Sequence, residues 1–164
     1  MELSRSYISV MERINRLVLY LIGFFMGALA LILFTQVILR YLLHSPLTWS
    51  EEVAKYLSIW VVFLGMAVAM RRTLLIAVEA VIQNVPESIG RAMRLLSLLL
   101  IMVFVGYLTY IGTVLAFGAA EQNFASLELP MSLVYAAIPV GSFLTLLNAV
   151  VVFIEMISER SMKA

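Results

Sequence analysis

The chain has 164 residues, of which 63% are hydrophobic and 13% are charged, and its formal net charge is +1. Soluble domains are usually about 45–50% apolar and about 25% charged, so this composition excludes an ordinary water-soluble globule. The absence of cysteine excludes disulfides, iron–sulfur clusters and thiolate metal sites, and the single histidine, His44, excludes a haem held between two histidines of this chain. The near-zero net charge argues against a nucleic-acid partner.

Gaps between the charged residues predict four membrane-spanning helices. A bilayer core about 30 Å thick needs roughly 20 helical residues, and no segment alternates polar and apolar residues as a barrel strand does. We therefore expect an all-α integral membrane protein that forms a single membrane domain, residues 1–164. The predicted spans are residues 17–39, 49–70, 95–119 and 130–154.

The second span must begin before its charge-free stretch. Residues 56–70 carry no charge but are too few to cross a bilayer, so the helix is expected to start near Trp49. Its first turns then carry Glu51, Glu52 and Lys55 at the depth of the headgroups. The segment Thr48–Glu51 also matches the capping-box pattern that starts helices.

Two further segments are expected to lie on the membrane surface. Residues 3–17 have apolar side chains on one helical face and charged ones on the other, which is typical of an amphipathic helix in contact with lipid. Residues 71–94 are expected to form a loop that contains a short interfacial helix, residues 74–85, before Pro86. The charged residues predicted to anchor these segments at the interface are Arg13, Arg16, Arg71, Arg72 and Glu79.

The basic residues predict the orientation. Nine of the 11 basic residues fall in the two termini and in residues 71–94, and only Arg40 and Lys55 fall on the other side. Because cytoplasmic segments are enriched in Lys and Arg, both termini and the 71–94 loop are expected in the cytoplasm.

Charged and aromatic residues gather where the first span ends and the second begins. The acidic side chains could stabilise the helix start and pair with Arg40, or they could form a contact for a partner protein. Both interpretations remain open from the sequence. The candidate contact residues are Arg40, Trp49, Glu51, Glu52, Lys55, Tyr56 and Trp60.

The spans contain little that could perform chemistry. No acidic or basic residue lies at mid-membrane depth, so a proton or ion relay through this chain is not expected. Gln36 and Asn148 are interpreted as interhelical hydrogen-bonding residues. No nucleophile–base pair, phosphate-binding glycine loop or zinc motif is present, which predicts neither an enzyme nor a cofactor or metal site.

Small residues and one proline predict helix packing. The pairs Gly23/Gly27, Gly65/Ala69 and Gly112/Ala116 would let helices approach closely, either within this chain or against a second protein. Pro139 is expected to kink the last span.

Several short motifs occur in a specific order over roughly residues 10–155. They are Arg40-Tyr41, Trp49-Ser50-Glu51-Glu52, Tyr56, Trp60, Phe63-Leu64-Gly65, Arg71, Ile76-Ala77-Val78-Glu79, Pro86, Pro130-Met131-Ser132, Tyr135 and Ile138-Pro139-Val140-Gly141. Together, these motifs resemble those of the small membrane subunit of TRAP (tripartite ATP-independent periplasmic) transporters. The sequence departs from the family pattern at Leu75 and Glu79, where a histidine and an aspartate are frequent.

This resemblance implies a tripartite importer in the bacterial inner membrane. In such a system a periplasmic substrate-binding protein captures a small organic anion, such as a dicarboxylate or a sialic acid, and a large permease subunit moves it with sodium. The small subunit is implied to bind the large one stably and to act as its scaffold in an elevator mechanism, with no catalytic role.

Two other classes remain as alternatives. A membrane anchor of a respiratory enzyme would usually carry histidines within its spans, and a small self-assembling exporter would usually carry an acidic residue there.

Overall fold

In the computed structural model, residues 2–42, 44, 47–82, 86–122 and 130–163 are described. Nearly all of this chain is helical, as expected. The helices are α1 (Glu2–Tyr41), α2 (Ser50–Ile82), α3 (Glu87–Gly118), the short α4 (Ser132–Tyr135) and α5 (Ala137–Lys163).

Four helical stretches are long and apolar enough to cross a membrane, which confirms the predicted fold class. The stretches are Ser6–Tyr41, Ser50–Met70, Ile89–Gly118 and Ser132–Ile157. Each contains or closely matches one predicted span.

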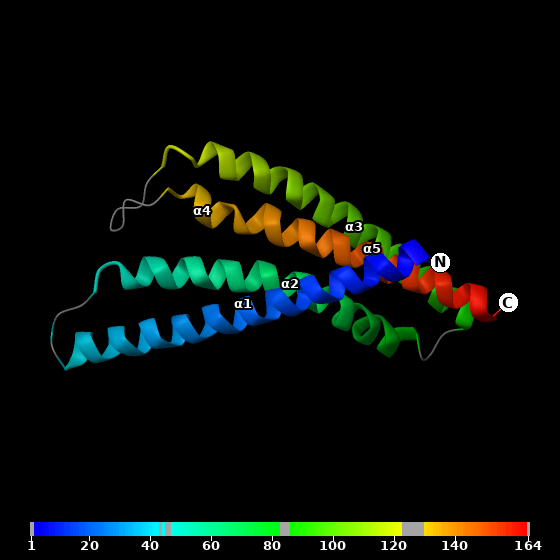
Figure 1. Ribbon diagram of the computed structural model, residues 1–164, viewed down its shortest axis with the longest axis horizontal. Helices are drawn as coiled ribbons and strands as arrows, with labels where there is room; N and C mark the ends of the chain where they lie inside the picture. The colour runs from blue at the N-terminus through cyan, green and yellow to red at the C-terminus, as the bar shows by residue number, and fades with distance from the viewer. Residues whose placement is uncertain (1, 43, 45–46, 83–85, 123–129, 164) are drawn as a thin grey trace.

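The four long helices form an open row rather than a closed bundle. Figure 1 shows the order α1, α2, α5, α3 from the bottom to the top of the view, and the main contacts join the neighbours in this order. α5 lies in the middle. In the most apolar 18 residues of the stretch Ser132–Ile157, which includes α5, 44% of the residues are buried, compared with 6% in the corresponding part of α1. In the described part of the chain, α1 and α3 do not touch each other. Two edge helices therefore present broad faces that no part of the described chain covers.

Two small apolar cores hold the row together. In one core, Met70 of α2 and Leu98 of α3 pack with Ala149 and Val152 of α5. In the other, Val18 of α1 packs against Leu64 and Val68 of α2. One core joins α2, α3 and α5 and the other joins α1 to α2, so the row has no single central core.

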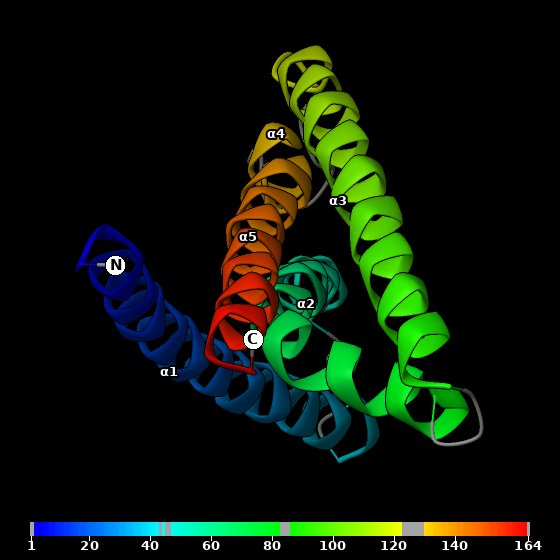
Figure 2. The ribbon, with the colours of Figure 1, turned by 90° about the vertical axis from the view of Figure 1, so that its right-hand side faces the viewer.

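The helices are longer than the sequence patterns predict. α1 runs without interruption through residues 3–17 and the first span, because no glycine or proline interrupts the chain before Gly23. α2 likewise continues to Ile82, and α3 begins at Glu87, so most of the expected 71–94 loop is helical. Figure 2 shows the first part of α2 nearly end-on and its last turns crossing the view toward the start of α3. The short helix predicted at residues 74–85 is thus, up to Ile82, the last part of α2, which runs in a different direction from the first part.

The last span is interrupted as expected, but upstream of the proline. The helix breaks at Ala136, between α4 and α5, and Pro139 lies in the first turn of α5. A proline ring clashes with the carbonyl four residues earlier, which here belongs to Tyr135, the last residue of α4. The position of the break follows from that clash.

Candidate functional site

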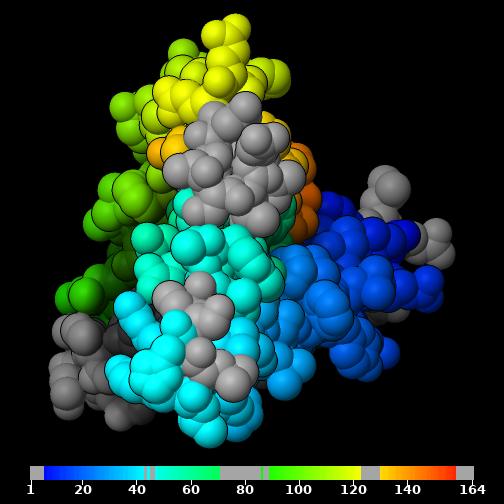
Figure 3. Space-filling model, turned by 90° about the vertical axis from the view of Figure 1, so that its left-hand side faces the viewer, coloured from blue at the N-terminus to red at the C-terminus, as the bar shows by residue number. Residues whose placement is uncertain are grey.

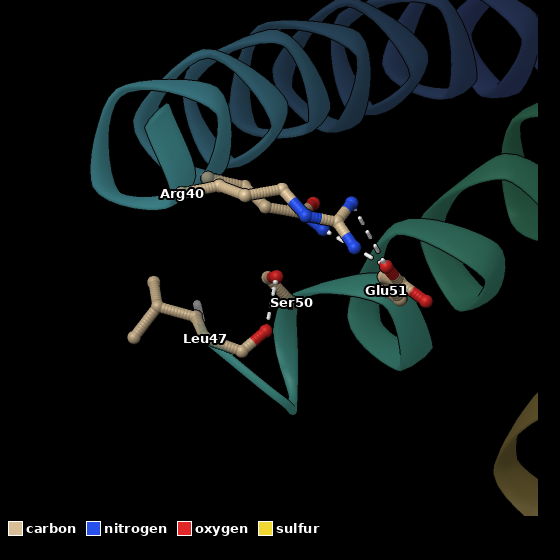
Figure 4. Close-up of polar contacts among 5 residues, drawn as sticks. Arg40, Leu47, Ser50 and Glu51 are labelled. Carbon is tan, nitrogen blue, oxygen red and sulfur yellow. Dashed lines mark hydrogen bonds and ion pairs between the residues drawn. The ribbon is translucent and has the colours of Figure 1, made fainter. Parts of the chain in front are cut away.

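The charged patch predicted from the sequence forms where α1 ends and α2 begins. Figure 4 shows Arg40 and Glu51 pointing toward each other from the two helices. Nη1 of Arg40 lies 3.9 Å from Oε1 of Glu51, and the amide of Gln36 donates a 3.2 Å hydrogen bond to the same oxygen. Of the two interpretations left open by the sequence, pairing with Arg40 across the connection is observed for Glu51.

The start of α2 differs slightly from the predicted capping box. The backbone N–H of Val53 donates to the carbonyl of Trp49, which places Trp49 rather than Thr48 at the N-cap. The hydroxyl of Ser50 donates a 2.8 Å hydrogen bond back to the carbonyl of Leu47 (Figure 4). The hydroxyl of Ser50 thus ties the connection to the first turn of the helix.

The other two charged residues of the patch, Glu52 and Lys55, do not take part in the contacts between Arg40 and Glu51. Lys55 is exposed and forms no ion pair with a described residue. Oε2 of Glu52 is buried and has no hydrogen-bond partner among the described residues. Figure 3 shows the end of the molecule on which the patch lies, with the end of α1 and the start of α2 at the surface in cyan. The charge of Lys55 therefore remains accessible at this end of the molecule.

The aromatic residues of α2 divide between surface and interior. Trp49 is 37% exposed. Trp60, deeper in the helix, donates its Nε1–H to the carbonyl of Leu133 at 3.2 Å. Phe63 packs against Gly141 of α5. Trp60 and Phe63 thus pack within this chain, and Tyr56 is half-buried.

A buried polar cluster joins three helices near the middle of the row. Asn15 of α1 and Asn148 of α5 exchange two amide hydrogen bonds, of 2.6 and 2.9 Å. Asn148 also donates to the carbonyl of Ala67 in α2 at 2.9 Å. The predicted interhelical roles of Asn148 and Gln36 are confirmed, since Gln36 of α1 bonds to α2.

Asn15 was missed by the sequence analysis. It lies one turn from Met11 and from Val18, both buried, so it occupies the apolar face of the first helix. Nearer the N-terminus, the hydroxyl of Tyr7 donates to the carbonyl of Leu147 in α5. These two contacts hold the first half of α1 against the row.

The buried polar residues of the described chain are all uncharged. They are Asn15, Gln36, Ser50, Ser142, Thr145 and Asn148. All except Ser142 have hydrogen bonds within the chain. No group of three or more His, Cys, Asp or Glu side chains forms a metal site among the described residues, and His44 is exposed after the end of α1.

The predicted small-residue pairs have different surroundings. Gly112 lies so close to α5 that an added Cβ would sit 2.6 Å from a methyl carbon of Ile138, which marks the α3–α5 crossing. Gly23, Gly27 and Gly65 have no atom within 4 Å of such a Cβ. The Gly23/Gly27 pair therefore does not pack within the described chain.

Only two of the five residues predicted as interfacial anchors have described side chains. Arg13 and Arg16 are exposed on α1, and their role as anchors stays a prediction. The side chains of Arg71, Arg72 and Glu79 lie outside the described part.

Comparison with known proteins identifies the family. Residues 29–159 match the family described as tripartite ATP-independent periplasmic transporters, DctQ component. A putative TRAP transporter small permease protein of Haemophilus influenzae is 28% identical over 73% of this chain and 74% of its own length. The C4-dicarboxylate TRAP transporter small permease protein DctQ of Vibrio cholerae is 31% identical over 52% of this chain and 37% of its own.

A further relative is much longer than this chain. The sialic acid TRAP transporter permease protein SiaT of Haemophilus influenzae is 34% identical over 62% of this chain, but the matched segment is only 17% of SiaT. With SiaT and the Vibrio cholerae protein, the chain thus spans well under half the length of the relative it matches. The matched family covers most of the four-helix row, and the chain therefore belongs to the DctQ-component family of tripartite ATP-independent periplasmic transporters.

Proposed function

We propose that this chain is the small, non-catalytic membrane subunit of a sodium-coupled TRAP transporter that imports a small organic anion. Relatives named for sialic acid and for C4-dicarboxylates support that substrate class. The chain is stably bound to a large permease subunit, and a periplasmic substrate-binding protein delivers the solute to the pair.

The observation that carries the proposal is that no charged residue is among the buried residues whose side chains the structure describes. A route for sodium or for an organic anion through a bilayer needs ionisable side chains or a cluster of ligating oxygens at membrane depth. Here the buried amides of Asn15 and Asn148 bond to each other, and the hydroxyl of Thr145 bonds to its own helix. Transport then takes place in the large subunit.

The open row of helices supports a scaffold role in an elevator mechanism. A moving transport domain needs a neighbour that stays fixed, and a row with two uncovered edges offers a large surface for that purpose. Contact with membrane lipid at the interfacial residues would resist movement through the bilayer. The proposed anchors are Arg13, Arg16, Arg71, Arg72 and Glu79.

We place the chain in the inner membrane with both termini in the cytoplasm. Figure 1 shows the two termini at the same end of the row, opposite the connection between α1 and α2. The excess of basic residues near that end favours the cytoplasmic side. The charged patch then faces the periplasm.

That patch is the proposed contact for the large subunit or for the docked binding protein. Its residues are Arg40, Trp49, Glu51, Glu52, Lys55, Tyr56 and Trp60.

Replacing Glu51 and Glu52 together with alanine is expected to lower uptake without preventing membrane insertion. The side chains of Arg40 and Glu51 are 56% and 58% exposed, so the loss of their ion pair changes stability by no more than about 1 kcal/mol. Solute uptake and the amount of inserted protein are measured together. Glu121→Ala, an exposed acid outside the patch, is the control. Unchanged uptake in the double variant would exclude the patch as a contact.

Purification of the tagged chain in a mild detergent tests the function as a whole. A much larger hydrophobic chain is expected to co-purify in a constant ratio, and uptake is expected to require both chains. Full-rate uptake by the large permease without this chain would contradict the subunit role.

A further inference from the structure

The face of α3 that points away from the row is apolar apart from two tyrosines. Figure 2 shows α3 as one edge of the row, next to α5. Leu98 and Val105 point inward and are 1% and 3% exposed, whereas the opposite side is 53–78% exposed. We call this side the outer face of α3. Its residues are Leu96, Leu100, Val103, Tyr107, Tyr110, Val114 and Phe117.

The two tyrosines lie far from the membrane interfaces. Tyr107 is in the middle of the charge-free stretch between Arg94 and Glu121, at about 20 Å of helix from each, at 1.5 Å per residue. Tyr110 is one turn further along the same face. Tyrosines of an interfacial belt lie at headgroup depth, roughly 15 Å from the bilayer centre. These two do not belong to such a belt.

Their hydroxyls also lack the hydrogen bonds that other polar groups of α3 make. The hydroxyls of Thr109 and Thr113 donate to the carbonyls of Val105 and Thr109 in their own helix. The side chains of Tyr107 and Tyr110 are 64% and 66% exposed, and no bond from either to a described residue is present. Hydrocarbon offers no acceptor, and a hydroxyl without one is unfavourable there. The outer face of α3 is therefore more stable against a protein neighbour that supplies hydrogen-bond acceptors than against lipid.

We propose that the outer face of α3 is the surface on which a transmembrane helix of the large permease subunit packs. The neighbour carries hydrogen-bond acceptors, such as Ser, Thr or Asn side chains or free carbonyls, opposite Tyr107 and Tyr110. This inference rests on the proposed subunit function. In SiaT the matched segment is part of one longer permease chain. The rest of the SiaT chain is therefore a permanent neighbour of the matched segment, and this neighbour is not a second copy of that segment.

Photo-crosslinking in the intact complex tests the assignment. In two variants, a photoreactive phenylalanine analogue replaces Tyr107 or Tyr110. In two matched variants, the analogue replaces Phe24 or Phe34, which are 70% and 66% exposed on the other edge helix, α1. Irradiation of native membranes is expected to join the large permease chain to the α3 positions and not to the α1 positions. Adducts to lipid alone, to a second copy of this chain, or to the large chain only from α1 would overturn the proposal.

A conservative variant tests the role of the hydroxyls. Tyr107→Phe with Tyr110→Phe keeps the rings and is expected to lower recovery of the large chain about fivefold or more in detergent, through two lost hydrogen bonds. Tyr20→Phe, exposed on α1, is the control and is expected to change nothing. Recovery equal to wild type in the double variant would contradict the proposal.

The two experiments together distinguish this inference from the proposed function. If the large chain co-purifies but never crosslinks to α3, only this inference fails. If the large chain does not co-purify, the subunit function fails as well.

Discussion

Replacing Gly141 with alanine is expected to lower the free energy of unfolding by about 1–3 kcal/mol, because the new methyl group has no space at the α2–α5 crossing. An added Cβ would lie 2.6 Å from Cβ of Phe63 and 2.7 Å from its carbonyl carbon and oxygen. Two of these atoms belong to the backbone of α2, so relief requires movement of the whole helix. Thermal unfolding in detergent, followed by tryptophan fluorescence, measures the change.

Gly106 provides the matched control in α3. A Cβ added there has no neighbour within 4 Å, so Gly106→Ala is expected to be neutral or to stabilise the helix by up to about 1 kcal/mol. If Gly141→Ala unfolds at the same temperature as wild type, the close crossing of α2 and α5 is wrong.

Replacing Asn148 with leucine is expected to destabilise the protein by about 1–3 kcal/mol, because it leaves the buried amide of Asn15 without its partner. The same change removes the bond from α5 to the carbonyl of Ala67 in α2. Asn148 therefore connects the middle of the row to both α1 and α2, and its loss should loosen the first half of α1 most.

A double-mutant cycle with Asn15→Leu isolates the direct contribution of the amide pair. The double variant is expected to be more stable than the sum of the single losses predicts, by roughly 1–2 kcal/mol. Thr113→Val is the control, since that hydroxyl bonds only to its own helix at Thr109. Strict additivity of the two asparagine variants would show that the pair does not form.

The four spans could be predicted from the sequence because the bilayer imposes a simple constraint. An apolar helix must be about 20 residues long, and the charged residues mark its ends. The start of the second helix was expected near Trp49 and is observed at Ser50, even though its first turns carry charge. The same reasoning was weaker for the connecting segments, where amphipathic patterns predict a helical face but not whether the helix continues into the next span.

The arrangement of the helices could not be predicted, because hydropathy does not say which helix contacts which. Asn15 and Asn148 are 133 positions apart, and nothing local in either segment points to the other. The small-residue pairs show the same limit. Gly112 marks a close crossing, whereas Gly23 and Gly27 face open space although their spacing is the more familiar one.

The candidate patch was partly predictable because its residues are close in sequence. Arg40 and Glu51 flank one short connection, so a pairing between them was one of the two interpretations of the sequence, and it is observed. Whether Glu52 and Lys55 serve a partner depends on a surface that belongs to another chain, and that part stays a prediction.

Reconstitution of this chain by itself into lipid vesicles tests the subunit account most directly. With a sodium gradient and a sialic acid or a C4-dicarboxylate supplied together with the binding protein, the chain alone is expected to accumulate no solute, whereas vesicles that also contain the large permease should do so. Accumulation against a gradient by this chain alone would contradict the account.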